Sequence, residues 1–179
     1  MTDLSKNAGE WSELYVLLNT LGEGVLYSAD GELNKLPNNF CPVISITMQK
    51  AGQANDSPVP IKYIVDPASK TITLESGGET SSISMSELKA SAGSFFAIIS
   101  SRPGRAFQVP EISPMLDKLK NPVVKQSSSK KADIHIVLHD VMTGFENEVG
   151  FRATCKTPQT SDFIARYLAK NGGGRPFLA

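Results

Sequence analysis

Residues 133–140 read Asp-Ile-His-Ile-Val-Leu-His-Asp, and no other stretch of the chain is as informative about its structure. Apolar and polar side chains alternate along it, which is the pattern of a strand with one buried face. The buried face would hold Ile134, Ile136 and Leu138, and the opposite face Asp133, His135, Val137 and His139. The sequence therefore predicts a strand that opens with an acidic side chain.

A second strand is expected directly after it. The turn residues Met142-Thr143-Gly144 and Glu146-Asn147 follow the first strand, and alternation resumes over residues 148–156. One face of this second run would carry Val149, Phe151, Ala153 and Cys155, and the other Gly150, Arg152, Thr154 and Lys156. A hairpin of the two strands would bring the carboxylate of Asp133 near the ammonium group of Lys156.

Outward from this hairpin, helix and strand patterns alternate. Trp11, Leu14 and Leu18 recur at the spacing of one buried helical stripe, which predicts the first helix. β-Branched and aromatic runs predict strands at residues 24–29, 43–48, 61–65 and 71–74, in a largely antiparallel meander. Further helices are expected at residues 84–92, 94–101, 113–120 and 161–170, with Gly93 separating the first two.

These elements predict an α/β (α+β) fold with a central mixed β-sheet flanked by helices. One domain is expected over residues 1–158, followed by a divergent helix and glycine-rich tail over residues 159–179. The 18 basic and 18 acidic residues cancel, so net charge does not indicate a nucleic-acid partner. No segment approaches the roughly 20 apolar residues that span a bilayer, so we expect a cytoplasmic protein without membrane association.

Residues that could hydrolyse a phosphodiester lie on the predicted hairpin and the first helix. Such chemistry needs carboxylates to hold magnesium and a cation near the water or the phosphate. Asp133 and Lys156 could supply these groups, although a strand-capping aspartate and a solvated lysine fit the same pattern. Glu10 and Glu13 could reach a shared metal, or could simply occupy the first helical turn, where the helix dipole favours them.

Other polar residues are weaker candidates. His135 and His139 share a strand face, but no third nitrogen or sulfur ligand lies at a recognisable spacing, which favours surface or hydrogen-bonded histidines. Two loops carry cations that could contact DNA, or could simply be solvated. They contribute Lys125, Lys130 and Lys131 from a serine-rich loop, and Arg102 and Arg105 from either side of Pro103-Gly104.

Three blocks of this sequence, in the same order, resemble the HpaII-type restriction endonucleases. The first runs from Gly9-Glu10-Trp11-Ser12-Glu13 through residues 24–30 to Leu33-Asn34-Lys35. The second is Phe107-Gln108-Val109-Pro110-Glu111-Ile112, and the third runs from Ser128 through Asp133-Ile134 to Gly150-Phe151. The resemblance covers residues 7 to about 151.

The resemblance implies a nuclease fold of the PD-(D/E)xK class and magnesium-dependent cleavage of double-stranded DNA at CCGG sites. Asp133 would then be the metal-binding acid, and Glu10 and Glu13 could add a ligand. Double-stranded DNA would be the partner, and a homodimer is compatible with the sequence.

The chain departs from the family pattern after Gly150-Phe151. The family continues with Ser-Ile-Lys-Ser, whereas Thr154 stands here at the expected lysine position. Lys156, two residues later on the same strand face and about 6 to 7 Å further along, is the candidate substitute. Family members also continue beyond this strand. A catalytically inactive, truncated or frame-shifted homologue that keeps only DNA-binding or interaction capacity, or a chain that folds poorly, therefore remains an alternative.

Overall fold

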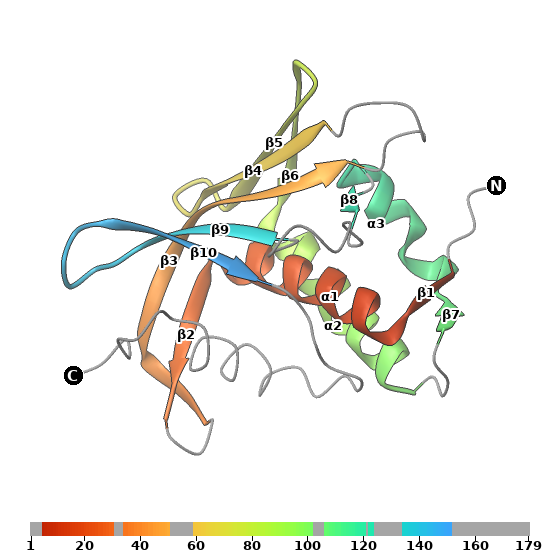
Figure 1. The fold of residues 1–179 in the computed structure, drawn as a ribbon, viewed down its shortest axis with the longest axis horizontal. Helices are drawn as coiled ribbons and strands as arrows, with labels where there is room; N and C mark the ends of the chain where they lie inside the picture. Colours follow the sequence, from red (N-terminus) through yellow and green to blue (C-terminus); the bar gives the residue numbers. More distant parts are fainter. Residues whose placement is uncertain are drawn as a thin grey trace.

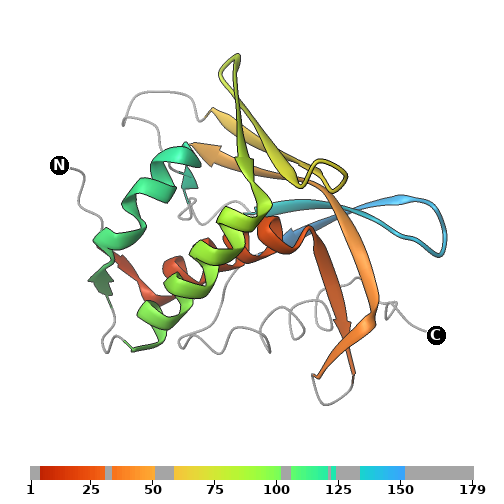
Figure 2. The ribbon, with the colours of Figure 1, turned by 180° about the vertical axis from the view of Figure 1, so that it is seen from behind.

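A computed structural model of the chain describes six ranges of residues, namely 5–30, 34–50, 59–101, 106–120, 122–123 and 134–151. Two long helices lie side by side against one face of a large twisted sheet (Figures 1 and 2). The expected α+β fold, a central sheet flanked by helices, is confirmed. The helix expected at residues 161–170, and the boundary expected after residue 158, lie outside the described residues.

The secondary structure contains three α-helices and one 3-10 helix among the described residues. The helices are α1 (Ala8–Glu23), α2 (Met85–Ser101), η1 (Pro110–Ile112) and α3 (Ser113–Lys118). The strands are β1 (Ser5–Asn7), β2 (Val25–Ala29), β3 (Lys35–Lys50), β4 (Pro60–Asp66), β5 (Thr71–Ser76), β6 (Glu79–Ser84), β7 (Ala106–Gln108), β8 (Pro122–Val123), β9 (Ile134–His139) and β10 (Glu146–Phe151).

The large sheet has the strand order β10-β9-β3-β4-β5-β6, and β2 and β8 also pair with β3. Every strand pair among the described residues is antiparallel, instead of the mixture of parallel and antiparallel pairs that we expected. Short turns explain this for β4 to β6, because a tight turn can join only antiparallel neighbours. At the β5–β6 turn, Gly77 and Gly78 have φ angles of 59° and 82°. Positive φ at both central residues is what a two-residue hairpin with a type I′ turn requires.

Helix α1 is buried on nearly all sides. Trp11, Leu14 and Leu18, the predicted stripe, are each 0% exposed, but so is Leu17. The reason is that α2 packs on one side of α1 and the sheet covers another (Figure 1). Gly24 ends the helix: its φ is 68°, and its amide donates to the carbonyl of Thr20 at 2.9 Å.

Helix α2 is continuous through Gly93, so the expected break between two shorter helices is wrong. Its buried side chains, Leu88, Ala92, Phe95 and Ile99, recur every three or four residues on both sides of the glycine. A glycine inside a helix costs only about 1 kcal/mol relative to alanine, which this continuous apolar stripe offsets.

The two long helices run antiparallel, and their backbones lie in close contact at Gly22. A Cβ added to Gly22 would lie 2.7 Å from the backbone nitrogen of Lys89 and 2.9 Å from its Cα. Near the other end of α1, Trp11 contacts Phe95 of α2. Only glycine therefore lets α1 meet the backbone of α2 at this point.

We expect Gly22→Ala to lower the free energy of unfolding by about 1 to 3 kcal/mol, because the new methyl group must push two helix backbones apart. Urea denaturation followed by circular dichroism would measure this loss. Gly93→Ala is the matched control, since no atom lies within 4 Å of a Cβ there. It should be neutral or stabilising by up to about 1 kcal/mol, through helix propensity alone. Equal effects of the two changes would contradict the close packing at Gly22.

Candidate active site

The hairpin of β9 and β10 has the arrangement that the sequence predicts. Its register pairs Ile134 with Phe151, His135 with Gly150 and Ile136 with Val149. The predicted inward residues of β9 are buried: Ile134, Ile136 and Leu138 are 0%, 3% and 2% exposed. His135, between two of them, is exposed on the open face of the sheet. Asp133 itself lies outside the described residues, and it directly precedes the buried Ile134.

The segment that contains Asp133 is anchored at one end of the sheet. Strand β8 and strand β9 both pair with β3 on the same side, with Val123 opposite Gln49 and His135 opposite Thr47. Two positions along a strand are about 7 Å apart. Val123 and Ile134, which flank residues 124–133 in the sequence, therefore lie close together next to the end of β3.

Most of the predicted site residues lie outside the described residues. The segment that joins β8 to β9 contains Asp133, Lys125, Lys130 and Lys131. In the sequence, all four lie between Val123, at the end of β8, and Ile134, at the start of β9. Arg102 and Arg105 belong to the segment that joins α2 to β7, and Thr154 and Lys156 follow β10. The structure thus describes the helix and strand ends next to these candidates in the sequence. The roles of the candidates themselves stay predictions.

Glu10 and Glu13 are described, and both lie in the first half of α1. Glu13 is only 5% exposed, whereas Glu10 is half-buried. Carboxylate oxygens are the ligands that Mg²⁺ prefers. The donor chemistry of Glu13 therefore fits a magnesium ion. The described ranges contain no group of three His, Cys, Asp or Glu side chains that could hold a metal ion.

A histidine–carboxylate pair occupies the open face of the hairpin, and the sequence reading did not identify it. His135 Nδ1 lies 2.9 Å from Glu148 Oε1, and the two side chains are 48% and 65% exposed. Glu148 is diagonal to His135, because Gly150 is the residue directly opposite. Of the two expected alternatives, a surface histidine or a hydrogen-bonded core histidine, His135 is the surface one. Pairing the two predicted strands in register is the signal that would have found Glu148.

The hairpin turn is tightly held by Asp140. One carboxylate oxygen accepts hydrogen bonds from the amides of Met142 (2.9 Å) and Thr143 (3.3 Å), and the other from the Thr143 hydroxyl (2.8 Å). These donors, the hydroxyl of Thr143 foremost, hold the pKa of Asp140 below its ordinary value. The geometry of β9 and β10 is therefore fixed from the turn as well as from the sheet.

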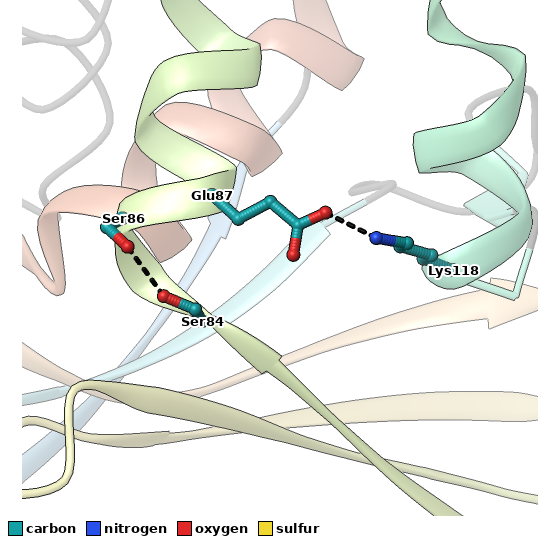
Figure 3. Close-up of polar contacts among 4 residues, drawn as sticks. All are labelled: Ser84, Ser86, Glu87 and Lys118. Atoms are coloured by element: carbon teal, nitrogen blue, oxygen red, sulfur yellow. Dashed lines mark hydrogen bonds and ion pairs between the residues drawn. The ribbon is translucent and has the colours of Figure 1, made fainter.

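A groove of about 350 Å³ lies elsewhere in the described part, between α2 and α3. Phe95, Ile112 and Met115 form part of its lining, and an ion pair between Glu87 and Lys118 joins the two helices beside it (Figure 3). Next to the start of α2, the hydroxyl groups of Ser84 and Ser86 form a hydrogen bond, with 2.7 Å between their Oγ atoms (Figure 3). This groove contains none of the predicted site residues.

Comparison with known proteins identifies close sequence relatives. The family described as HpaII restriction endonuclease matches residues 7–161. The type II restriction enzyme HpaII of Haemophilus parainfluenzae is 36% identical over 148 residues, which are 82% of this chain and 39% of that enzyme. The chain thus spans about two fifths of the length of this relative. No solved structure matches the chain. Among the described residues, no helix is long and apolar enough to cross a membrane.

Proposed function

The chain belongs to the HpaII restriction endonuclease family, and from this premise we propose that it is a type II restriction endonuclease that hydrolyses double-stranded DNA. The observation that carries the proposal is the β9–β10 hairpin. Its two strands pair antiparallel, as the sequence predicts, and it begins immediately after Asp133. Two paired strands provide the fixed geometry that phosphodiester hydrolysis requires.

We propose Asp133 as the metal-binding acid, with Glu13, and Glu10 beside it on α1, as further carboxylate ligands for Mg²⁺. The magnesium ion would polarise the phosphate and lower the pKa of a bound water. Lys156 is the lysine that we propose near the attacked phosphate. Lys125, Lys130 and Lys131 would contact backbone phosphates, since they belong to the segment that connects β8 to β9 and ends in Asp133.

The target that we propose is CCGG, which family membership suggests. This sequence is its own complement, so a two-fold symmetric homodimer would present the same residues to both strands. Arg102 and Arg105 are the residues that we propose for reading guanine, because arginine can donate two hydrogen bonds to that base in the major groove.

Incubation with plasmid DNA tests the proposal. With magnesium ions, we expect discrete fragments whose ends map to CCGG, and with a chelator in place of magnesium we expect intact plasmid. A plasmid from which every CCGG site has been removed is the control for sequence specificity. Intact CCGG plasmid in the presence of folded protein and magnesium would overturn the proposed activity.

A second candidate is a DNA-binding homologue without catalytic activity. Thr154 favours it, because an uncharged side chain stands where the family pattern has a lysine. This homologue would bind duplex DNA with an affinity that falls as salt rises, since phosphate contacts release counterions. Salt-dependent binding without any cleavage would therefore distinguish it from the restriction enzyme.

A further inference from the structure

The turn between β9 and β10, residues 141–146, exposes large apolar side chains to solvent. Val141, Met142 and Phe145 are 57%, 88% and 71% exposed, and they are three of the five large hydrophobic residues that are exposed in the described part of the chain. The backbone of this hairpin tip is held in place, because the amide of Asp140 donates to the carbonyl of Phe145 at 2.9 Å. Apolar side chains presented on an ordered surface are typical of a binding site for another macromolecule.

The charge of the hairpin indicates the class of that partner. Residues 134–151 contain three acidic side chains, Asp140, Glu146 and Glu148, and neither lysine nor arginine. DNA carries a negative charge on every phosphate, so its contact with the tip would bring like charges together. A protein surface that combines apolar side chains with a cation is the complementary partner. Glu146, the last residue of the tip, is exposed and makes no ion pair with another described residue.

Another surface of the same chain has this complementary character. It lies on the β2–β3 arm, which consists of residues 25–29 and 35–42. Lys35 is exposed, and its Nζ lies 3.5 Å from the centroid of the Tyr27 ring. The Tyr27 ring lies beside that of Phe40, with 6.0 Å between their centroids, and Phe40 is 40% exposed. The arm therefore presents a cation next to two aromatic rings.

The hairpin and the arm leave the sheet at the same place. Val43 of β3 pairs with Leu138 of β9, and its neighbour Pro42 pairs with Val25 of β2. Beyond this point the arm and the hairpin point in different directions in both views (Figures 1 and 2). The tip therefore does not cover the arm of its own molecule. A two-fold axis beside the branch point would place the tip of each copy on the arm of the other, which closes a dimer with two equal contacts.

We propose that two copies of this chain form a two-fold dimer in which the hairpin tip of each copy packs on the β2–β3 arm of the other. Met142 and Phe145 contact the aromatic rings of that arm, and Glu146 forms an ion pair with Lys35 of the partner subunit. The choice of a second copy as partner rests on the proposed function, since a target that is its own complement suits a symmetric pair.

Sedimentation velocity of the full chain over a range of concentrations, without DNA or metal, measures the dimer. We expect the wild type to change from monomer to dimer as its concentration rises. Phe145→Ser should raise the dissociation constant of the dimer about tenfold or more, because a few aromatic anchors supply most of the affinity of an interface. The variant should fold, since Phe145 is exposed within one copy. Val59→Ser, a change to another exposed hydrophobic residue directly before β4, is the control and should dimerise like the wild type.

Reversal of charge tests the proposed ion pair. Lys35→Glu and Glu146→Lys should each raise the dissociation constant about tenfold, because each brings like charges together across the interface. The double variant restores a pair of opposite charges and should recover most of the affinity, whereas residues that act only within one copy would give no such rescue. Lys70→Glu, a change to an exposed lysine in the β4–β5 turn, is the control and should dimerise like the wild type.

The outcomes separate this interface from the proposed activity. A wild-type chain that stays monomeric at every concentration, or a dimer that Phe145→Ser and the single charge reversals leave unchanged, would overturn the interface. Weaker binding of duplex DNA by Phe145→Ser with an unchanged dimer would assign the tip to DNA, and would overturn it as well. Cleavage of CCGG plasmid by a monomer would overturn the interface alone, whereas a dimer with the expected variant effects but no cleavage would overturn the proposed activity alone.

Discussion

Asp133→Asn is expected to abolish magnesium-dependent DNA cleavage, with a loss of roughly a thousandfold or more, since a metal ion contributes several kcal/mol to such a transition state. The change replaces one carboxylate oxygen by an amide nitrogen of similar size, so it removes the charge that attracts the metal. The measurement is the rate of plasmid cleavage with saturating magnesium, beside wild-type protein prepared in the same way.

The structure indicates that this variant will fold. Ile134, which follows Asp133, is fully buried, and β9 pairs in register with both β3 and β10 through residues after Asp133. Thermal unfolding should therefore match that of the wild type. Asp117→Asn is the control, because it removes a negative charge from an exposed aspartate on α3, away from the proposed site residues in the sequence. It should cleave DNA at the wild-type rate. Wild-type cleavage by the Asp133 variant would show that the metal is held elsewhere.

The sequence predicted the elements whose patterns are local. Alternation over residues 133–140 predicted β9 and put its buried side chains on one face, and alternation from residue 148 predicted a strand where β10 lies. The stripe of α1 was read correctly. Strand β6 was missed because its Ser and Thr residues give little apolar alternation, although Gly77-Gly78 before it is a hairpin signal. The first part of β3 was missed because Pro37 and Pro42 disfavour strand predictions.

The candidate site was less predictable, because its contacts depend on register and on segments far apart in sequence. Alternation alone placed His135 on the correct face, but only the pairing of β9 with β10 shows that Glu148 reaches it. Similarly, nothing local to β8 indicates that Val123 pairs with β3 next to the start of β9. That pairing is what brings Val123, just before the segment with three lysines, next to the strand end that Asp133 precedes in the sequence.

Trp11→Ala should cause the largest loss of stability among single core substitutions, about 3 to 5 kcal/mol in the free energy of unfolding. Trp11 is fully buried and contacts two other elements. Its ring meets Phe95 of α2 edge-on at 5.6 Å and stacks on Phe107 of β7 at 6.3 Å, and its Nε1 donates to the Phe107 carbonyl at 3.0 Å. The alanine variant would lose all three contacts and leave a cavity where α1, α2 and β7 meet. Urea denaturation at constant temperature would measure the loss.

Trp11→Phe separates packing from hydrogen bonding in this cluster. Phenylalanine keeps an aromatic ring against Phe95 but cannot donate to the carbonyl of Phe107, so it should cost clearly less than alanine. Loss of this hydrogen bond alone should lower the free energy of unfolding by about 1 to 3 kcal/mol if the Phe107 carbonyl stays buried without a donor. If Trp11→Ala cost less than about 1 kcal/mol, the value typical of an average substitution, the start of α1 would not be part of the cooperative core. Glu10 and Glu13 flank Trp11 on the same helical turn, so in that case α1 could not hold carboxylates rigidly enough to serve a metal ion.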